Sequence, residues 1–253
     1  MKVLFILVDG MRPDSLGAVP LAREFAAKSL KTMNARTVMP CITLPCHMSL
    51  FHSVPPERHG VFENEYPLQP HPERGLFELL YREYKKSAML YSWEELRDIA
   101  RPGMLYRTEY IRGTLDTYRQ TMETLTGRAV RCMDDGADFV FLYLGMADEV
   151  GHKAGWMSGE YLEAVVYSWE LIDRAVKAAG DEYAVIVTAD HGGHGLDHWL
   201  DIPEDMTIPL FIRHRDIAPG ELRGNVSIMD IAPTITALMG IPADEDWEGR
   251  SLL

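Results

Sequence analysis

Cysteine is scarce in this sequence of 253 residues, which contains only Cys41, Cys46 and Cys132. Three is an odd number, and the spacing matches no disulfide framework. We therefore expect reduced thiols, as in a cytosolic protein. Cys41 and Cys46 are also five positions apart, beyond the usual spacing of a structural zinc pair. Packed, inert thiols are the better interpretation.

Long hydrophobic runs are also missing. The amino terminus, "MKVLFILVDG", has only six consecutive apolar residues before Asp9, which is too few for the core of a signal peptide. No segment approaches the ~20 apolar residues that a membrane-spanning helix needs. We therefore expect a protein that has no membrane segment and resides in the cytoplasm.

Basic residues are outnumbered, with 25 lysines and arginines against 38 acidic residues and a formal net charge of −13. A nucleic-acid-binding surface needs a basic stripe, so this balance argues against one. It does not exclude a small anionic substrate, because bound divalent cations reverse the local sign of charge. The expected partner is a small molecule, and the sequence does not indicate the oligomeric state.

Three continuous apolar runs predict buried strands, at residues 2–10, 138–148 and 183–193. Residues 86–92 and 208–214 are further strand candidates. The helical patterns between them are residues 13–30, 75–85, 114–135, 158–179 and 229–240. This alternation predicts an α/β fold, a three-layer sandwich with a mostly parallel central sheet.

The chain has no internal repeat, no low-complexity segment and no shift in composition that would mark a linker. Its length suits one α/β domain, so we expect a single domain over residues 1–253. The stretch 64–135 is less regular and rich in proline at its start, "NEYPLQPHPERG". We therefore expect any small lid beside the sheet to lie within it.

Acidic residues and histidines follow the three central strands. They are Asp9, then Asp148 and His152, then Asp190, His191, His194 and His198. In an open α/β sheet, ligands bind beyond the carboxyl ends of the strands, so these side chains should share one edge. The spacing of Asp148 and His152 brings both to one face of a helical turn. Mixed carboxylate and imidazole ligands suit Zn²⁺ or Mn²⁺.

Each of these residues alone is equally consistent with a helix cap or an exposed loop. Their joint occurrence after three strands favours a metal site. The remaining histidines are interpreted as turn or surface residues; they are His47, His52, His59, His71 and His214. Arg12 could reach an anionic substrate or form a surface ion pair.

A second motif, "MPCITLPCHMSLFHSVPPERHG" at residues 39–60, places Thr43 before an apolar pattern that predicts a helix. Pro45 would lie in the first turn, where its missing N–H costs nothing. A hydroxyl there faces free backbone amides and the positive end of the helix dipole, which favours phosphate binding. Metal coordination can make threonine a nucleophile, although a helix cap is the simpler role for Thr43 taken alone.

Together these motifs resemble the alkaline phosphatase superfamily, most closely its nucleotide pyrophosphatase/phosphodiesterase branch. "VDGMRPD" is similar to the first-strand aspartate motif, and "TLPCHMSLFHSVPPERHGVFEN" is similar to the nucleophile block. "DEVGH" and "ADHGGHG" resemble the other ligand blocks, and "MDIAPTITALMGIP" resembles the closing helix. The motifs occur in this order over nearly the whole chain. The resemblance implies an alkaline phosphatase-like core.

The resemblance also implies two divalent metal ions, Zn²⁺ or alternatively Mn²⁺. The ligands of one ion would be Asp9, Thr43, Asp190 and His191. The ligands of the other would be Asp148, His152 and a third histidine, for which His198 fits better than His194. Thr43 would be the nucleophile, and water would then hydrolyse the phospho-threonine.

The chain departs from the family pattern in two respects. Phosphodiesterases of the family usually carry an asparagine after the proline of the nucleophile block, where this chain has Cys46. A thiol is a poorer donor to a phosphoryl oxygen, so another group or the backbone amides of residues 43–46 must replace it. Asn64 matches another polar position and is a predicted substrate contact. The short interval from His191 to His198 implies that a nucleotide-recognition lobe is absent or reduced.

The predicted function is a two-metal phosphoric ester hydrolase, preferably a phosphodiesterase. No arginine lies beside Thr43 in the sequence to neutralise a dianionic monoester, which favours a monoanionic diester. Alternatives with the same site are a phosphonate hydrolase, a phosphomonoester hydrolase or a phosphoglycerate-type transferase. A metal-binding protein without turnover is the alternative from another class.

Overall fold

The computed structural model describes residues 1–66, 74–114 and 117–253. One sheet of eight strands, in the order β4-β3-β5-β1-β6-β7-β2-β8, forms its centre. The strands are β1 Lys2–Val8, β2 Leu30–Arg36, β3 Ser87–Tyr91, β4 Arg107–Tyr110, β5 Phe139–Leu144, β6 Tyr183–Thr188, β7 Thr207–Arg213 and β8 Gly220–Glu221. Of the pairings in these ranges, only those of β7 are antiparallel, which confirms the mostly parallel sheet.

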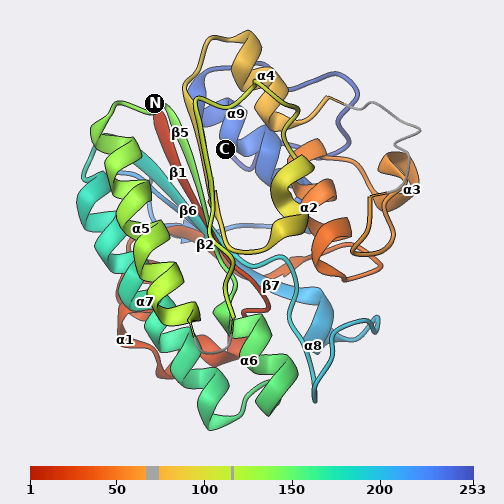
Figure 1. The fold of residues 1–253 in the computed structure, drawn as a ribbon. Coiled ribbons are helices and arrows are strands. Elements are labelled where there is room, and N and C mark those ends of the chain that lie inside the picture. The colour runs from red at the N-terminus through yellow and green to blue at the C-terminus, as the bar shows by residue number, and fades with distance from the viewer. Residues whose placement is uncertain (67–73, 115–116) are drawn as a thin grey trace.

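Helices cover both faces of the sheet (Figure 1), with α1, α5 and α7 on one face and α2, α4 and α9 on the other. The α-helices are α1 Pro20–Ala27, α2 Thr43–His52, α3 Pro56–His59, α4 Leu76–Arg82, α5 Tyr118–Asp134, α6 Met146–Ala154, α7 Gly159–Ala179, α8 Pro203–Met206 and α9 Ile231–Met239. The 3₁₀ helices are η1 Pro13–Ala18, η2 Glu94–Asp98 and η3 Ile228–Asp230. The predicted three-layer sandwich is confirmed.

Aromatic side chains attach α2 to the sheet. The ring of Phe51, near the end of α2, meets Phe141 of β5 edge to face, with the ring centroids 5.0 Å apart. Phe141 in turn packs against Phe5 of β1 at 5.3 Å. Such aromatic pairs stabilise a core beyond their buried area. The helix that begins at Thr43 is thereby fixed against the two central strands.

Local differences from the sequence prediction have simple causes. The predicted helix over 13–30 is divided into η1 and α1, because Pro20 cannot continue a helix and instead begins a new one. The strands β2, β4 and β8 were not predicted. β2 mixes buried, half-buried and exposed residues, and β4 alternates half-buried and exposed ones, so both lack the continuous apolar run of a central strand.

The range 64–135, where a lid was expected, supplies α4, β3, β4 and α5 to the sheet and its helical layers. Residues 67–73 and 115–116 of that range lie outside the described residues. The lid and the single-domain organisation therefore stay predictions.

None of the described helices combines the length and hydrophobicity that crossing a bilayer requires. All three cysteines are buried and free, as a protein with reduced thiols requires. The cytoplasmic location stays a prediction.

Candidate metal centre

Asp9, Asp190 and His191 lie together at the carboxyl ends of β1 and β6. The parallel register pairs Leu7 with Thr188, so Asp9 and Asp190, each two positions further on, emerge side by side. One ligand atom from each of the three residues lies within 4.8 Å of the others. His191 Nε2 is 3.3 Å from Asp9 Oδ1 and 3.4 Å from Asp190 Oδ2. We name these three residues the first group.

Thr43 adjoins the first group. It is the first residue of α2, with Pro45 in the first turn as the sequence predicted. Thr43 Oγ1 is 3.2 Å from His191 Nε2. The hydroxyl therefore faces the same buried space as the two carboxylates, at the amino-terminal end of a helix whose dipole favours negative charge there.

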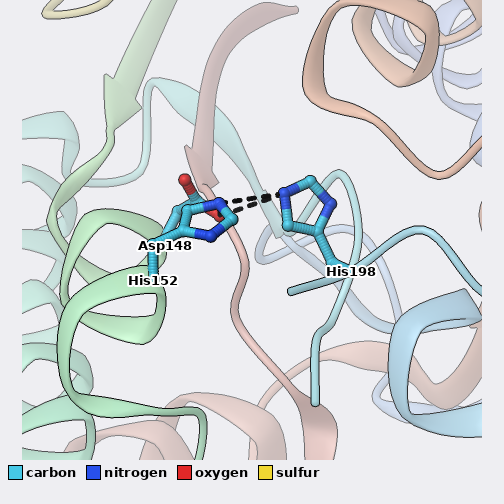
Figure 2. A group of neighbouring side chains, drawn as sticks. All are labelled: Asp148, His152 and His198. Atoms are coloured by element: carbon cyan, nitrogen blue, oxygen red, sulfur yellow. Dashed lines mark hydrogen bonds and ion pairs between the residues drawn. The ribbon is translucent and has the colours of Figure 1, made fainter. Parts of the chain in front are cut away.

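Asp148, His152 and His198 form the second group, shown in Figure 2. Asp148 and His152 lie one turn apart on α6, and His198 reaches them from the loop that follows β6 (Figure 2). Asp148 Oδ1 is 3.5 Å from His152 Nε2 and 3.7 Å from His198 Nε2. The Asp-x₃-His spacing thus does bring both side chains to one face of a helical turn.

Backbone carbonyls fix the protonation of all three histidines in the two groups. Nδ1 lies 2.8 Å from the carbonyl oxygen of Leu196 for His152, of Gly192 for His191 and of Cys41 for His198. A carbonyl oxygen only accepts, so each Nδ1 carries the proton and each Nε2 presents a lone pair. This is the usual arrangement by which a neighbouring group prepares a histidine for metal binding.

Two imidazole nitrogens of the second group face each other. His152 Nε2 and His198 Nε2 are 3.1 Å apart, and both are acceptors once Nδ1 is protonated. Two acceptors repel each other at this distance unless a cation binds both. The donor set, two imidazole nitrogens and one carboxylate oxygen, is one that Zn²⁺ accepts. The residues of the second group therefore fit a metal ion.

Carboxylate oxygens in both groups also lack partners. Asp9 Oδ1, Asp148 Oδ1 and Asp190 Oδ2 are inaccessible to solvent and have no hydrogen-bond partner among the described residues. Native proteins rarely leave buried polar atoms unsatisfied. Burial raises the pKa of all three carboxyl groups, and the nearby Asp190 carboxylate raises the pKa of Asp9 and Asp148 further. A bound cation would satisfy these oxygens and reverse this effect.

His194 does not join either group. Its Nδ1 is 2.8 Å from Asp205 Oδ1, and Asp205 is fully buried. Asp205 Oδ2 accepts a hydrogen bond from the Leu200 N–H at 2.9 Å. His194 and Asp205 thus anchor the loop that carries His198, and the structure brings His198 rather than His194 to the second group.

Three supporting residues were missed from the sequence. The Tyr143 hydroxyl donates to Asp9 Oδ2, and His47 Nδ1 donates to the Thr43 carbonyl oxygen at 2.8 Å. Gly10 adopts a φ of +66°, and a Cβ on it would lie 3.1 Å from the Cα of Asp148. The signal for Tyr143 was a hydroxyl at the end of the otherwise apolar run "FVFLYL".

Several histidines interpreted as turn or surface residues are buried instead, namely His47, His52, His59 and His214. The interpretation was wrong for α2 because every residue of that helix is buried, so it shows no exposed polar face. His59 is satisfied internally, with Nε2 at 3.0 Å from the Ser49 hydroxyl. His71 lies outside the described residues.

Cys46 is buried and bonded within the fold. Its sulfur accepts a hydrogen bond from the Thr37 hydroxyl at 3.1 Å, and its amide donates to the Ile42 carbonyl at 3.0 Å. The Leu44 amide donates to Asn64 Oδ1, also at 3.0 Å. The amides of Leu44 and Cys46 are therefore not available to a phosphoryl oxygen. Pro45 has no N–H, so the backbone alternative drawn from the sequence is reduced to the Thr43 amide.

A family model described as type I phosphodiesterase / nucleotide pyrophosphatase matches residues 3–83 and 78–208. The match includes Thr43 and every residue of both groups. The chain belongs to the type I phosphodiesterase / nucleotide pyrophosphatase family. This confirms the resemblance drawn from the motifs, and it places the chain among the hydrolases.

Some curated relatives are similar to this chain over only part of their length. The 2,3-bisphosphoglycerate-independent phosphoglycerate mutase of Gluconobacter oxydans is 30% identical over 149 residues, which are 51% of this chain and 26% of the mutase. The mutase of Clostridioides difficile is 29% identical over 51% of this chain and 26% of its own length. The chain thus matches about a quarter of the length of these curated relatives.

Solved structures share the fold. Murine ectonucleotide pyrophosphatase / phosphodiesterase 5 superposes with a TM-score of 0.80 at 14% identity, covering 96% of both chains. A second structure of that protein, an inactive threonine-to-alanine variant in complex with AMP, gives 0.80 at 13% identity and covers 96% of both chains. A phosphonate monoester hydrolase from Silicibacter pomeroyi gives 0.78 at 16% identity, over 99% of this chain and 75% of that one. The alkaline phosphatase-like core is confirmed.

Proposed function

We propose that the protein is a phosphodiesterase that works through a phospho-threonine intermediate with two divalent metal ions, Zn²⁺ or Mn²⁺. Its substrate is a small phosphate ester. The ligands of one ion are Asp9, Thr43, Asp190 and His191, and those of the other are Asp148, His152 and His198.

The observation that carries this proposal is the pair of Nε2 atoms, 3.1 Å apart, on His152 and His198. Together with the unpartnered oxygens of Asp9, Asp148 and Asp190, they form a cluster of ligand atoms that bound cations would satisfy. Among the described residues, Thr43 is the one aliphatic hydroxyl hydrogen-bonded to this cluster, and the other hydroxyl, that of Tyr143, donates to Asp9.

The reaction follows from the place of Thr43. When bound, two cations stabilise the ionised hydroxyl of the nucleophile and the charge on the phosphoryl and leaving oxygens. Thr43 Oγ1 forms a bond to phosphorus as the bond to the departing alcohol breaks on the opposite side, and the proton lost by Thr43 leaves with the alcohol. Water then cleaves the bond from Thr43 to phosphorus, which releases a phosphate monoester and restores the hydroxyl. Catalysis is therefore mainly positioning and charge stabilisation.

Asn64 is proposed to hold a phosphoryl oxygen. The hydrogen bond from the Leu44 amide to Asn64 Oδ1 fixes this side chain at the first turn of α2, next to Thr43. An asparagine whose oxygen accepts in this way keeps two N–H donors on Nδ2. Asn64 thus supplies the donor that the buried thiol of Cys46 does not.

A monoanionic diester fits the charges better than a dianionic monoester. Arg12 donates to the Gly193 carbonyl at 2.8 Å and pairs with Asp14 at 2.6 Å, so its guanidinium group is engaged as in the surface ion pair considered from the sequence. Across residues 1–66, 74–114 and 117–253, no arginine forms a hydrogen bond or ion pair with Thr43 or with either group. The described residues therefore provide no arginine contact that would stabilise the extra negative charge of a monoester.

The second candidate substrates are a phosphonate monoester and a phosphate monoester, with phosphoglycerate-type transfer as a further variant. They come from the likeness to the Silicibacter phosphonate monoester hydrolase and to the phosphoglycerate mutases. The alternative from another class, metal binding without turnover, predicts no hydrolysis at all.

Metal analysis combined with a comparison of three substrates tests the proposal. Purified protein loaded with Zn²⁺ or with Mn²⁺ is assayed on bis(4-nitrophenyl) phosphate, 4-nitrophenyl phosphate and 4-nitrophenyl phenylphosphonate. We expect two metal ions per chain and the highest kcat/KM on the diester. A higher kcat/KM on either of the other substrates would replace the diester by that substrate class, and no turnover would favour the non-catalytic alternative.

A further inference from the structure

Large apolar side chains are exposed on the loops that carry the candidate site. They are Met39, Phe62, Leu196, Trp199 and Leu200, which are between 38% and 57% exposed. We name these five residues the apolar rim. In Figure 1 the segments that adjoin α2, α3 and α8, and that contain these residues, lie on the same side of the sheet. Apolar side chains gathered beside a site indicate a binding surface.

Hydrogen bonds tie part of the apolar rim to the second group. His198 Nδ1 donates to the Cys41 carbonyl oxygen, and the Cys41 thiol lies 2.9 Å from the His198 carbonyl oxygen and 3.5 Å from that of Leu200. The segment that ends in Met39-Pro40-Cys41 is therefore held against the segment of Trp199 and Leu200. These residues border His198 directly.

The other two members adjoin the remaining site residues. The Leu196 carbonyl oxygen accepts the hydrogen bond from His152 Nδ1, so this residue lies beside the second group. Phe62 is two positions before Asn64, which is bonded to the first turn of α2. Four members of the apolar rim thus border the second group, and Phe62 lies on the segment that carries Asn64 to the first turn of α2.

Acidic residues stand between the apolar members. Glu63 and Glu65 are exposed beside Phe62, and the side chain of Asp197 is 43% exposed with an oxygen 4.0 Å from His152 Nδ1. These carboxylates repel a second anionic group, such as a further phosphate, at the entrance to the site. An uncharged apolar group meets no such penalty and gains from leaving water.

We infer that the apolar rim binds the apolar, uncharged alcohol part of the substrate. On this inference, which rests on the proposed function, the preferred ester is a monomeric amphiphilic phosphodiester. Its phosphate lies at Thr43 and Asn64, and its alkyl or aryl group lies on the apolar rim. Nucleoside polyphosphates are disfavoured by the acidic residues.

A series of 4-nitrophenyl alkyl phosphates with methyl, ethyl, propyl and butyl groups tests the inference, because the leaving group stays the same and only the alkyl group changes. Half-burial of each added methylene gives about a twofold rise in kcat/KM, so the butyl ester should exceed the methyl ester about eightfold. The double variant Phe62→Ser/Trp199→Ser should bring this ratio close to one. The variant Tyr84→Ser is the matched control, since Tyr84 is 95% exposed and lies before the amino end of β3, away from the site. It should keep the eightfold ratio.

The outcomes separate the inference from the proposed function. A flat series in an active enzyme overturns the inference and leaves the proposed function intact. No turnover of any ester overturns both. An unchanged ratio in the double variant also overturns the inference. A dimer in sedimentation velocity that dissociates in the double variant would overturn the inference too, because the apolar rim would then bind a second copy of the chain. Binding to phosphatidylcholine vesicles that the double variant loses would also overturn it, because the apolar rim would then bind a membrane.

Discussion

His191 and His198 stack face to face, with ring centroids 3.7 Å apart and planes inclined by 7°. His191 belongs to the first group and His198 to the second, so this contact links the two candidate metal positions. Burial lowers the pKa of each ring to about 3. Two stacked imidazoles can lie this close because both are neutral, and the neutral form is the one that binds a metal ion. The stacking therefore joins the buried first group to the second group, whose His152 is partly exposed.

Removal of the Thr43 hydroxyl should abolish turnover without removing the metal ions. We expect Thr43→Ala to lower kcat on a diester by about 10³-fold or more, as loss of a nucleophile does in other enzymes. Metal content should stay near two per chain, because the carboxylates and histidines of both groups remain. Thr43→Ser, which keeps a hydroxyl, is the control and should retain measurable turnover. Equal rates in Thr43→Ala and the parent protein would rule out Thr43 as the nucleophile.

The two histidines of the loop after β6 should behave differently towards metal. His198→Ala removes a nitrogen that faces Asp148 and His152, so we expect the loss of one metal ion per chain. His194→Ala is the matched control, because His194 contacts Asp205 instead. It should keep two ions. Elemental analysis after gel filtration distinguishes them, and metal loss in the His194 variant alone would reverse the assignment.

Tyr143→Phe should weaken the metal site while leaving the fold intact. The variant keeps the aromatic ring but loses the hydroxyl that donates to Asp9 Oδ2. Loss of such a supporting bond typically costs about 10- to 100-fold in metal affinity or activity. Competition with a chelator measures the affinity. An unchanged affinity would show that Tyr143 only fills space.

Metal affinity should rise with pH. The pKa values of Asp9, Asp148 and Asp190 are raised above the ordinary 3.8, so the metal-free protein holds protons that a metal ion must displace. The metal-free folded state therefore binds more protons than the unfolded chain above pH 3.8, and these groups lower its stability as pH rises. His191 and His198, whose pKa is lowered to about 3, act in the opposite direction. They raise the stability of the folded state as the pH rises from about 3 to their ordinary pKa of 6.5.

The corresponding measurement is the increase in Tm that added Zn²⁺ produces at pH 5.0 compared with pH 6.5 and 8.0. His191 and His198, with a pKa of about 3 in the folded protein, are already neutral over this range, so their titration does not contribute to the trend. We expect a larger increase at the higher pH. An increase that is the same at all three values would contradict the raised carboxyl pKa values.

Gly192 is expected to tolerate no side chain. A Cβ at this position would lie 2.0 Å from the carbonyl oxygen of Glu204, where the Gly192 and Gly193 amides donate to the carbonyl oxygens of Asp205 and Glu204 at 2.7 and 2.8 Å. Gly192→Ala should lower the free energy of unfolding by about 1–3 kcal/mol, the usual cost of overpacking. Gly159→Ala is the control, because open space surrounds this residue at the start of α7. Urea unfolding of the metal-free proteins compares the two, and equal stabilities would contradict the close approach.

Much of the central sheet could be predicted from the sequence. β1, β5 and β6 are buried on both faces, so each is a continuous apolar run, and the residues that follow them were recognisable as site candidates. The spacing of Asp148 and His152 also predicts, within a single helical turn, that the two side chains lie on the same face. These are local patterns, because one strand or one turn of helix already contains the information.

Other features depend on contacts between distant segments. The strands β2 and β4 are recognised only by their partners, since their own residues alternate in exposure. By their positions in the motif, both Asn64 and Cys46 could contact a phosphoryl oxygen. The tertiary contacts distinguish the two, because the Leu44 amide donates to Asn64 whereas the Cys46 thiol is buried against Thr37.

The sequence by itself determined the three central strands, the family and the set of candidate metal ligands. Only the tertiary structure decided which histidine of the loop after β6 faces inward. His194 and His198 have the same chemistry and lie four positions apart. His198 meets the carbonyl oxygen of Cys41, 157 positions away, whereas His194 meets the carboxylate of Asp205. A ring orientation of this kind is set by whichever acceptor the fold brings within reach of Nδ1, and no local pattern encodes that acceptor.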